Sequence, residues 1–201
     1  MNLIISTFEI AILIILPLII FYQKSGWKPK SVFIWLPVIY LIWYLSYGVF
    51  HEFMHLFGVW LSGKEIYQLY LFPHFWKGHF GPLYVNYNFQ GDSWDFIIIL
   101  LPYLRDALLA IIGYMIIKRK TLKHPFTAGL VLVIFILSSL YDVSNNYIAY
   151  LMGYMNDFNA LKVSSNIFIA HIIGISVIAT ATVAGIKTIT LANYYPSMKG
   201  C

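Results

Sequence analysis

Charged residues are scarce in this sequence. Only 10% of its 201 residues are Asp, Glu, Lys or Arg, whereas soluble domains average about 25%. Hydrophobic residues make up 60% of the chain, and the mean hydropathy is +0.75. A soluble protein of this size exposes much of its surface to water and could not bury so many apolar side chains. The same apolar content excludes intrinsic disorder. The composition therefore predicts an integral membrane protein.

Cysteine is nearly absent, and acidic residues are few. The single cysteine is the last residue, Cys201, which excludes a framework of disulfides within the chain. Eight acidic residues stand against thirteen Lys and Arg, for a net charge of +5. The cations lie in short segments between apolar runs. This arrangement is typical of a membrane orientation signal and argues against a nucleic-acid partner; the partner of the apolar surface is the lipid bilayer.

Five apolar runs are long enough to cross a bilayer as helices, which takes about 20 residues each. Between the second and third runs, residues 63–93 are rich in aromatics and interrupted by Pro and Gly, and Leu83–Phe89 alternates as a strand does. We expect an all-α polytopic membrane protein, a single membrane domain over residues 1–201, with a short β-hairpin or re-entrant segment after the second helix. The predicted spans cover about residues 3–22, 32–62, 94–117, 126–151 and 167–191.

The basic residues predict an orientation for these spans. Nine of the thirteen fall on one side of a five-span arrangement, after the first and third spans and near the chain end. The positive-inside rule makes that side cytoplasmic, so we expect the N-terminus outside and the C-terminus in the cytoplasm. The nine are Lys24, Lys28, Lys30, Lys118, Arg119, Lys120, Lys123, Lys187 and Lys199.

The second span contains the pattern HExxH at residues 51–55. Its histidines, His51 and His55, are one helical turn apart on one face, where both rings can bind the same Zn²⁺. Glu52 is placed to act as general base on a metal-activated water and then to protonate the leaving amine. Ionisable residues within a membrane span are costly and need partners. We therefore predict His51 and His55 as metal ligands and Glu52 as the catalytic residue.

A catalytic zinc ion usually has a third protein ligand and one open position. Counted from the predicted cytoplasmic ends at 1.5 Å per residue, His51 lies roughly 29 Å along its span, Asp142 roughly 24 Å and Asp106 roughly 17 Å. Asp142 is thus nearly level with His51, and we predict it as the third ligand. Asp106 remains an alternative, as does Glu65, which follows the turn at the end of the second span.

Asp142 also belongs to a polar stripe on the fourth span. Ser138 and Ser139 precede it, and Asn145 and Asn146 follow it, at the spacings that share one helix face. Such a stripe faces protein or water and not lipid. We predict that Asn145 and Asn146 bind substrate, through its backbone or the developing oxyanion. The alternative is that the stripe joins helices through hydrogen bonds.

These motifs resemble those of the site-2-protease-type intramembrane metalloproteases. Gly48–His55 is similar to their first motif, and Ser138–Val143 is similar to the Ser-x-x-x-Asp stretch of small zincin membrane peptidases related to them. The Pro and Gly that usually accompany the family's aspartate do not flank Asp142. The resemblance extends over roughly residues 31–160 and implies a Zn²⁺ cofactor with Asp142 as its third ligand.

The resemblance implies an intramembrane zinc metalloprotease, with a membrane protein or signal-peptide-like segment as substrate. A helical substrate has no free backbone amides, so it must unwind before it is cut. An exposed edge in Leu83–Phe89 could then pair with the unwound strand. The alternative is a divalent-metal transporter or metal-binding membrane protein that uses the same His and Asp residues, for which Glu52 has no required role. A further alternative is an inactive membrane scaffold.

Overall fold

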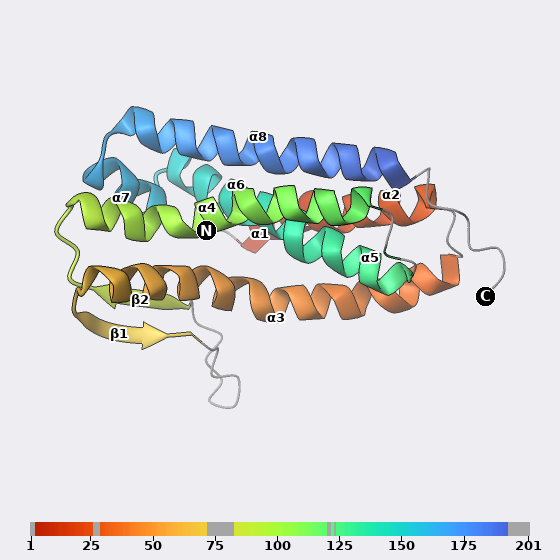
Figure 1. The fold of residues 1–201 in the computed structure, drawn as a ribbon, viewed down its shortest axis with the longest axis horizontal. Helices are drawn as coiled ribbons and strands as arrows, with labels where there is room; N and C mark the ends of the chain where they lie inside the picture. Colours follow the sequence, from red (N-terminus) through yellow and green to blue (C-terminus); the bar gives the residue numbers. More distant parts are fainter. Residues whose placement is uncertain (1–2, 26–28, 72–82, 120–121, 123, 193–201) are drawn as a thin grey trace.

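The structure is a computed structural model that describes residues 3–25, 29–71, 83–119, 122 and 124–192. Five helical segments within it are long and apolar enough to cross a membrane: Thr7–Lys24, Ile34–Ser62, Ser93–Lys118, Phe126–Leu151 and Ile167–Leu191. These segments and one small two-stranded sheet confirm the predicted all-α polytopic fold (Figure 1).

Three spans are single helices and two are interrupted by a π-helical turn. The single helices are α3 (Pro29–Ser62), α4 (Ser93–Lys118) and α8 (Ile167–Leu191). The first span consists of α1 (Leu3–Ile10), the π turn η1 (Ala11–Ile15) and α2 (Leu16–Lys24). The fourth consists of α5 (Pro125–Val131), the π turn η3 (Leu132–Leu137) and α6 (Ser138–Leu151).

The predicted β-hairpin is present between α3 and α4. Strands β1 (Ile66–Tyr70) and β2 (Tyr84–Tyr87) pair antiparallel, with Leu69 opposite Val85. Residues 72–82 of the predicted interfacial segment lie outside the described residues. The residue just before β2, Leu83, packs on α3 where Gly48 leaves room, since a Cβ at Gly48 would stand 2.8 Å from the Leu83 Cδ1. The hairpin is therefore held beside the helix that contains HExxH.

An ion-pair cluster joins the two ends of the hairpin. Lys64, just after α3, places its Nζ 2.6 Å from Asp95 Oδ1 and 3.0 Å from Asp92. Asp92 is the N-cap of α4 and accepts from the Asp95 backbone N–H, while the Asp95 side chain accepts from the Asp92 N–H in return. The Asp95 backbone N–H and the Lys64 ammonium lower the pKa of Asp92. The cluster fixes where β1 leaves α3 and where β2 enters α4.

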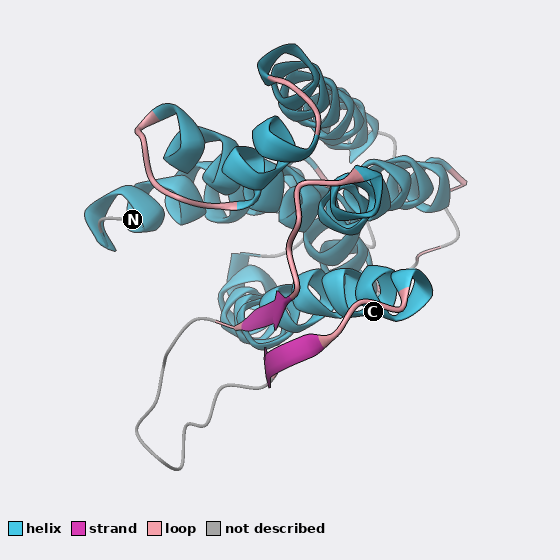
Figure 2. Ribbon diagram, turned by 90° about the vertical axis from the view of Figure 1, so that its left-hand side faces the viewer, coloured by secondary structure: helices cyan, strands magenta, loops and turns pink. Residues whose placement is uncertain are grey.

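Helix α4 is the central helix of the bundle. It packs against α3, η3, α6, α7 (Asp157–Ser164) and α8. Figure 2 shows the helices gathered in one bundle, with the two-stranded sheet at its edge. Buried aromatic and aliphatic side chains fill the space between the spans, the largest being Trp43 and Tyr22. Trp43 donates its indole N–H to the Ser138 hydroxyl at 3.0 Å and so links α3 to α6 without an unsatisfied polar group.

A short helix that we did not predict, α7 (Asp157–Ser164), follows the fourth span. Gly153, at φ +84°, reverses the chain after α6. Asn156 caps α7 through its side-chain oxygen and donates its amide N–H to the Asn146 carbonyl, ten residues back along α6. Phe158 and Leu161 are fully buried beneath α7. These contacts return the start of α7 toward the bundle interior, and Asp157 is its first residue.

Candidate metal centre

The two histidines of HExxH lie on one face of α3, directed toward the bundle interior. Their exposed fractions are 7% for His51 and 6% for His55. Their Nε2 atoms are 3.1 Å apart, and the ring centroids are 4.9 Å apart. The spacing of one helical turn thus brings both ring nitrogens to a common point, as the sequence predicts.

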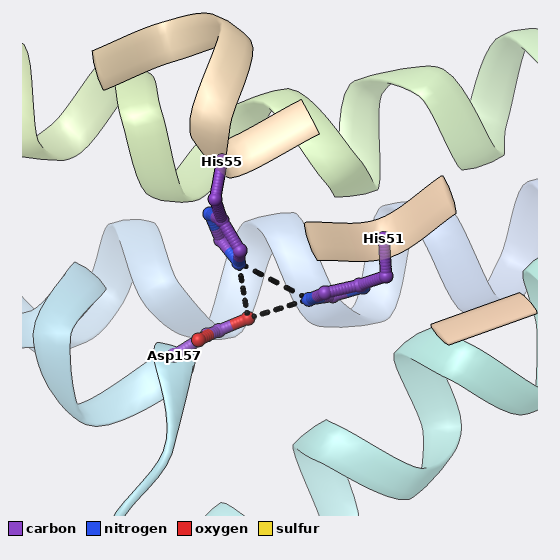
Figure 3. A group of neighbouring side chains, drawn as sticks. All are labelled: His51, His55 and Asp157. Carbon is purple, nitrogen blue, oxygen red and sulfur yellow. Dashed lines mark hydrogen bonds and ion pairs between the residues drawn. The ribbon is translucent and has the colours of Figure 1, made fainter. Parts of the chain in front are cut away.

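A third potential ligand reaches this point from α7. Asp157 Oδ2 lies 3.0 Å from His51 Nε2 and 3.2 Å from His55 Nε2 (Figure 3). The buried Tyr103 of α4 donates its hydroxyl to the same oxygen at 2.9 Å. Asp157 therefore supplies a carboxylate beside two imidazole nitrogens.

The other nitrogen of each ring is held by a hydrogen-bond acceptor. His51 Nδ1 lies 2.7 Å from Asp142 Oδ2, and His55 Nδ1 lies 3.0 Å from the Ile98 carbonyl oxygen. A carbonyl oxygen and a carboxylate can only accept, so both Nδ1 atoms carry the proton. In the neutral rings each Nε2 then presents a lone pair. Two nitrogens and the Asp157 oxygen then converge as three acceptors, an arrangement that a bound cation would satisfy.

Proline in α4 explains why the Ile98 carbonyl is available to His55. In an α-helix the carbonyl of residue 98 accepts from the N–H of residue 102. Residue 102 is Pro102, which has no N–H, so the Ile98 oxygen lacks its usual intrahelical partner. Close contact with α3 is also needed, and Gly58 permits it: a Cβ there would stand 3.0 Å from the Ile98 Cα. Pro102 and Gly58 together place an acceptor at His55.

The spacing of the three atoms fits a zinc ion. Bonds of about 2.0–2.1 Å at tetrahedral angles separate zinc ligands from one another by about 3.3 Å. The separations here are 3.0, 3.1 and 3.2 Å, so small side-chain movements would suffice. Two imidazoles and a carboxylate are also ligand types that zinc prefers in catalytic sites. Among the described residues, His51, His55 and Asp157 are the group of potential ligands that could hold a metal ion.

Asp142, which we predicted as the third ligand, has a different place. As the depth estimate predicts, Asp142 lies level with His51, and its carboxylate contacts that ring. The contact is with Nδ1, however, and not with the Nε2 atom that faces His55 and Asp157. Asp142 also accepts from Arg105 Nη2 at 3.3 Å and from Asn146 Nδ2 at 3.1 Å. With Asp157 already at the open side of both rings, the structure gives Asp142 the position of a group that orients a ligand.

The predicted substrate-binding residues face neighbouring groups of the protein. Asn146 donates to the Asp142 carboxylate and backbone carbonyl, and Asn145 donates to the buried Glu9 of α1 at 2.6 Å. The stripe on α6 therefore joins helices and supports Asp142, as its alternative interpretation states. Glu52 is half-buried next to His51, and the described residues give its carboxylate no hydrogen-bond or ion-pair partner.

The two alternative third ligands do not join the group. Asp106 is paired with its neighbour Arg105, whose Nη2 donates to Asp106 Oδ1 at 2.6 Å. Adjacent positions on a helix point apart, but the long arginine side chain folds back and contacts Asp106 and Asp142 together. Glu65 is exposed at the start of the hairpin.

Sequence reasoning missed Asp157, Tyr103 and Pro102. A signal for Asp157 was present: Asn156 is a favourable N-cap, and Phe158 and Leu161 have the spacing of one buried helix face. That pattern predicts a short amphipathic helix with Asp157 in its first turn. Its return into the membrane bundle depends on the chain reversal at Gly153, which no local pattern reveals. For Pro102, the signal was a proline within the third span, which leaves the carbonyl four residues earlier, that of Ile98, without its helical N–H partner.

Comparisons with protein-family models, characterised proteins and solved structures find no match to this chain.

Proposed function

We propose that this protein is an intramembrane zinc metalloprotease, of the site-2-protease type, that hydrolyses peptide bonds in membrane-embedded or membrane-adjacent protein substrates. The observation that carries the proposal is the convergence of His51 Nε2, His55 Nε2 and Asp157 Oδ2 within 3.2 Å of one another, next to Glu52. A transport site would need the ligands but not a neighbouring carboxylate that binds nothing else.

Local charge supports a cation at this point. The centre and its immediate contacts contain the carboxyl groups of Glu52, Asp106, Asp142 and Asp157, against the single guanidinium of Arg105. Buried charges in a membrane protein are stable only when they are compensated. A divalent cation held by His51, His55 and Asp157 would offset most of the negative excess.

Each side chain has a part in the proposed reaction. Bound zinc supplies a Lewis acid that lowers the pKa of a coordinated water and polarises the scissile carbonyl. Glu52 accepts the proton of the attacking water and transfers it to the leaving amine nitrogen. Asp142 and the Ile98 carbonyl hold the two histidines in the tautomer that leaves Nε2 free, and Tyr103 fixes the Asp157 carboxylate.

The hairpin supports a role for β-pairing in substrate binding. Strands β1 and β2 pair only with each other among the described residues, so each has an edge without a strand partner. Leu83 holds the start of β2 against α3, near the turn that carries His51. An unwound substrate segment can add to such an edge through backbone hydrogen bonds. Deletion of Leu83–Phe89 should then reduce proteolysis, and full proteolysis by a zinc-loaded deletion variant would contradict this step.

Glu52→Gln tests the proposed function. Wild type and variant are reconstituted in vesicles with single-span model proteins that carry a helix-breaking Asn-Pro pair in mid-span, and products are identified by mass spectrometry. Glu65→Gln is the matched control, because Glu65 is exposed and outside the centre. We expect Glu52→Gln to retain about one zinc per chain and to lose cleavage by about 10²- to 10⁴-fold.

An experiment with the same vesicles distinguishes a protease from a metal transporter. Zinc entry is followed with an encapsulated fluorescent indicator. Zinc uptake that is lost in Asp157→Ala but unchanged in Glu52→Gln, without cleavage by the wild type, would favour a metal transporter. Equal cleavage by wild type and Glu52→Gln would show that Glu52 is not the general base.

A further inference from the structure

The distribution of charge along the chain is strongly asymmetric. All eight acidic residues lie outside residues 10–51, 107–141 and 158–201, and those segments hold ten of the thirteen Lys and Arg. The second halves of α4 and α8 therefore contain basic residues without any acid. Figure 1 shows these helices side by side and running in the same direction, so their C-terminal ends share one end of the bundle.

A groove of about 380 Å³ lies between α4 and α8 near that end. Ile111 and Tyr114 line it from α4, and Ala179, Val183 and Ala184 line it from α8. The small alanines create the hollow. The groove is nearly all apolar, and its volume is in the range of small-molecule sites, about 300–1,000 Å³. Its walls suit a hydrocarbon chain.

Two lysine ammonium groups lie near the ring of Tyr114, which lines this groove. Lys187 lines it, and its Nζ lies 5.9 Å from the centroid of the Tyr114 ring. Lys118 Nζ lies 5.9 Å from the same centroid. Neither ammonium forms an ion pair with a described residue, and Arg119 follows directly. Both ammonium groups thus lie near the same tyrosine ring, and the neighbouring sequence contains no acidic residue. This local positive charge favours the binding of an anion.

The dimensions match one leaflet of a bilayer. Ile111 is seven residues before Lys118, and Ala179 is eight before Lys187, which corresponds to about 10–12 Å along the helices. Half of the hydrocarbon core is about 15 Å thick. An acyl chain in the groove would thus have its phosphate at the level of the two ammonium groups, where tyrosine is also favoured.

We propose that the groove between α4 and α8 binds an anionic phospholipid, with one acyl chain against Ile111, Ala179 and Val183 and the phosphate between Lys118 and Lys187. The site is built from the C-terminal halves of α4 and α8 and is separate from the metal centre. It does not depend on the proposed protease activity.

The test uses the full chain, purified in detergent, delipidated and titrated with phosphatidylglycerol or phosphatidylcholine of identical acyl chains. Bound lipid is counted by native mass spectrometry. Each lysine near a lipid surface contributes about 1 kcal/mol of attraction, so two give a preference for the anionic lipid of about 10- to 30-fold. The paired substitution Lys118→Gln with Lys187→Gln should abolish that preference. Lys162→Gln, on the exposed surface of α7, should preserve it.

A second variant tests the groove itself. Ala179 is exposed, so Ala179→Trp fills the groove without disturbing the core and should weaken binding of both lipids. Equal affinity of wild type for the two lipids, or unchanged binding by Ala179→Trp, would overturn the proposal. Full displacement of phosphatidylglycerol by inorganic phosphate would also overturn it, because the lysines would then hold a soluble anion without any contribution from the groove. Thermal unfolding of each variant shows whether it is folded.

Discussion

Replacing Asp142 and Asp157 separately by asparagine tests the geometry of the metal centre. Asp157 Oδ2 faces both Nε2 atoms, whereas Asp142 faces only His51 Nδ1. We expect Asp157→Asn to lose zinc, because an uncharged amide replaces the ligand. Asp142→Asn should still bind one zinc, but more weakly, because it removes only the charge that orients His51.

The structure gives a magnitude for Asp142→Asn. Loss of a group that orients a metal-bound histidine typically costs 10- to 100-fold in metal affinity, or about 1.4–2.7 kcal/mol. The Asp142 carboxylate accepts from His51 and Arg105 through Oδ2 and from Asn146 through Oδ1. Asparagine has one acceptor oxygen, so its amide N–H₂ must face one of these donors. We therefore expect a loss of about 100-fold.

Competition with a chelator of known zinc affinity measures both variants, with metal content determined by mass spectrometry. Asp106→Asn is the matched control, because Asp106 is also buried and also contacts Arg105 but touches neither histidine. Cobalt replacement adds a spectroscopic check, since loss of a ligand changes the visible absorption and loss of an orienting contact changes it little. Tight, stoichiometric zinc in Asp157→Asn together with complete loss in Asp142→Asn would refute the assignment and make Asp142 the ligand.

Two further predictions concern the packing around the metal centre, and a third concerns the ion-pair cluster at the hairpin. Pro102→Ala supplies a backbone N–H that competes with His55 for the Ile98 carbonyl. Zinc affinity, measured by chelator competition, should therefore fall about 10-fold. Unchanged affinity would show that the missing N–H at residue 102 does not matter for the metal centre. Gly58→Ala places a Cβ 2.9 Å from Leu101 Cδ1 and 3.0 Å from the Ile98 Cα, so it should lower the free energy of unfolding by about 1–3 kcal/mol. Gly185→Ala, whose Cβ would be 3.7 Å from its nearest neighbour, is the control and should not destabilise the protein. Equal thermal unfolding temperatures for the two variants would contradict this reasoning. The pKa of Asp92 is lowered by the Asp95 N–H and Lys64, so its stabilising contribution is present above the unfolded value of about 3.9 and is lost as pH falls through the folded value. The difference in unfolding temperature between wild type and Asp92→Asn should therefore be smaller at pH 3 than at pH 6, and a difference that stays constant or grows as pH falls would contradict this reasoning.

Much of the architecture follows from local sequence. The apolar runs predict five spans whose bounds agree with the helices to within a few residues, and the alternation at Leu83–Phe89 predicts the strand β2. The helical repeat also predicts that His51 and His55 share a face, because their spacing of four residues is close to one turn. These features depend on neighbours along the chain, so a single sequence is enough to find them.

The third ligand depended on contacts between distant segments. A depth estimate along straight helices brought Asp142 to the level of His51 but could not say which ring nitrogen it would meet. Asp157 lies beyond the end of the fourth span, and it reaches the histidines only because Gly153 reverses the chain and Asn156 ties α7 to the Asn146 carbonyl.

The sequence by itself determined the class of the protein, its spans and two of the three candidate ligands, because membrane solvation and the 3.6-residue repeat act locally. Tertiary structure alone decided that Asp157 completes the group, that Asp142 and the Ile98 carbonyl hold the two Nδ1 atoms, and that Lys118 and Lys187 both lie near the Tyr114 ring. Those contacts join residues up to 106 positions apart. They depend on how closely helices approach, which Gly58 and Pro102 govern through packing and a missing hydrogen bond.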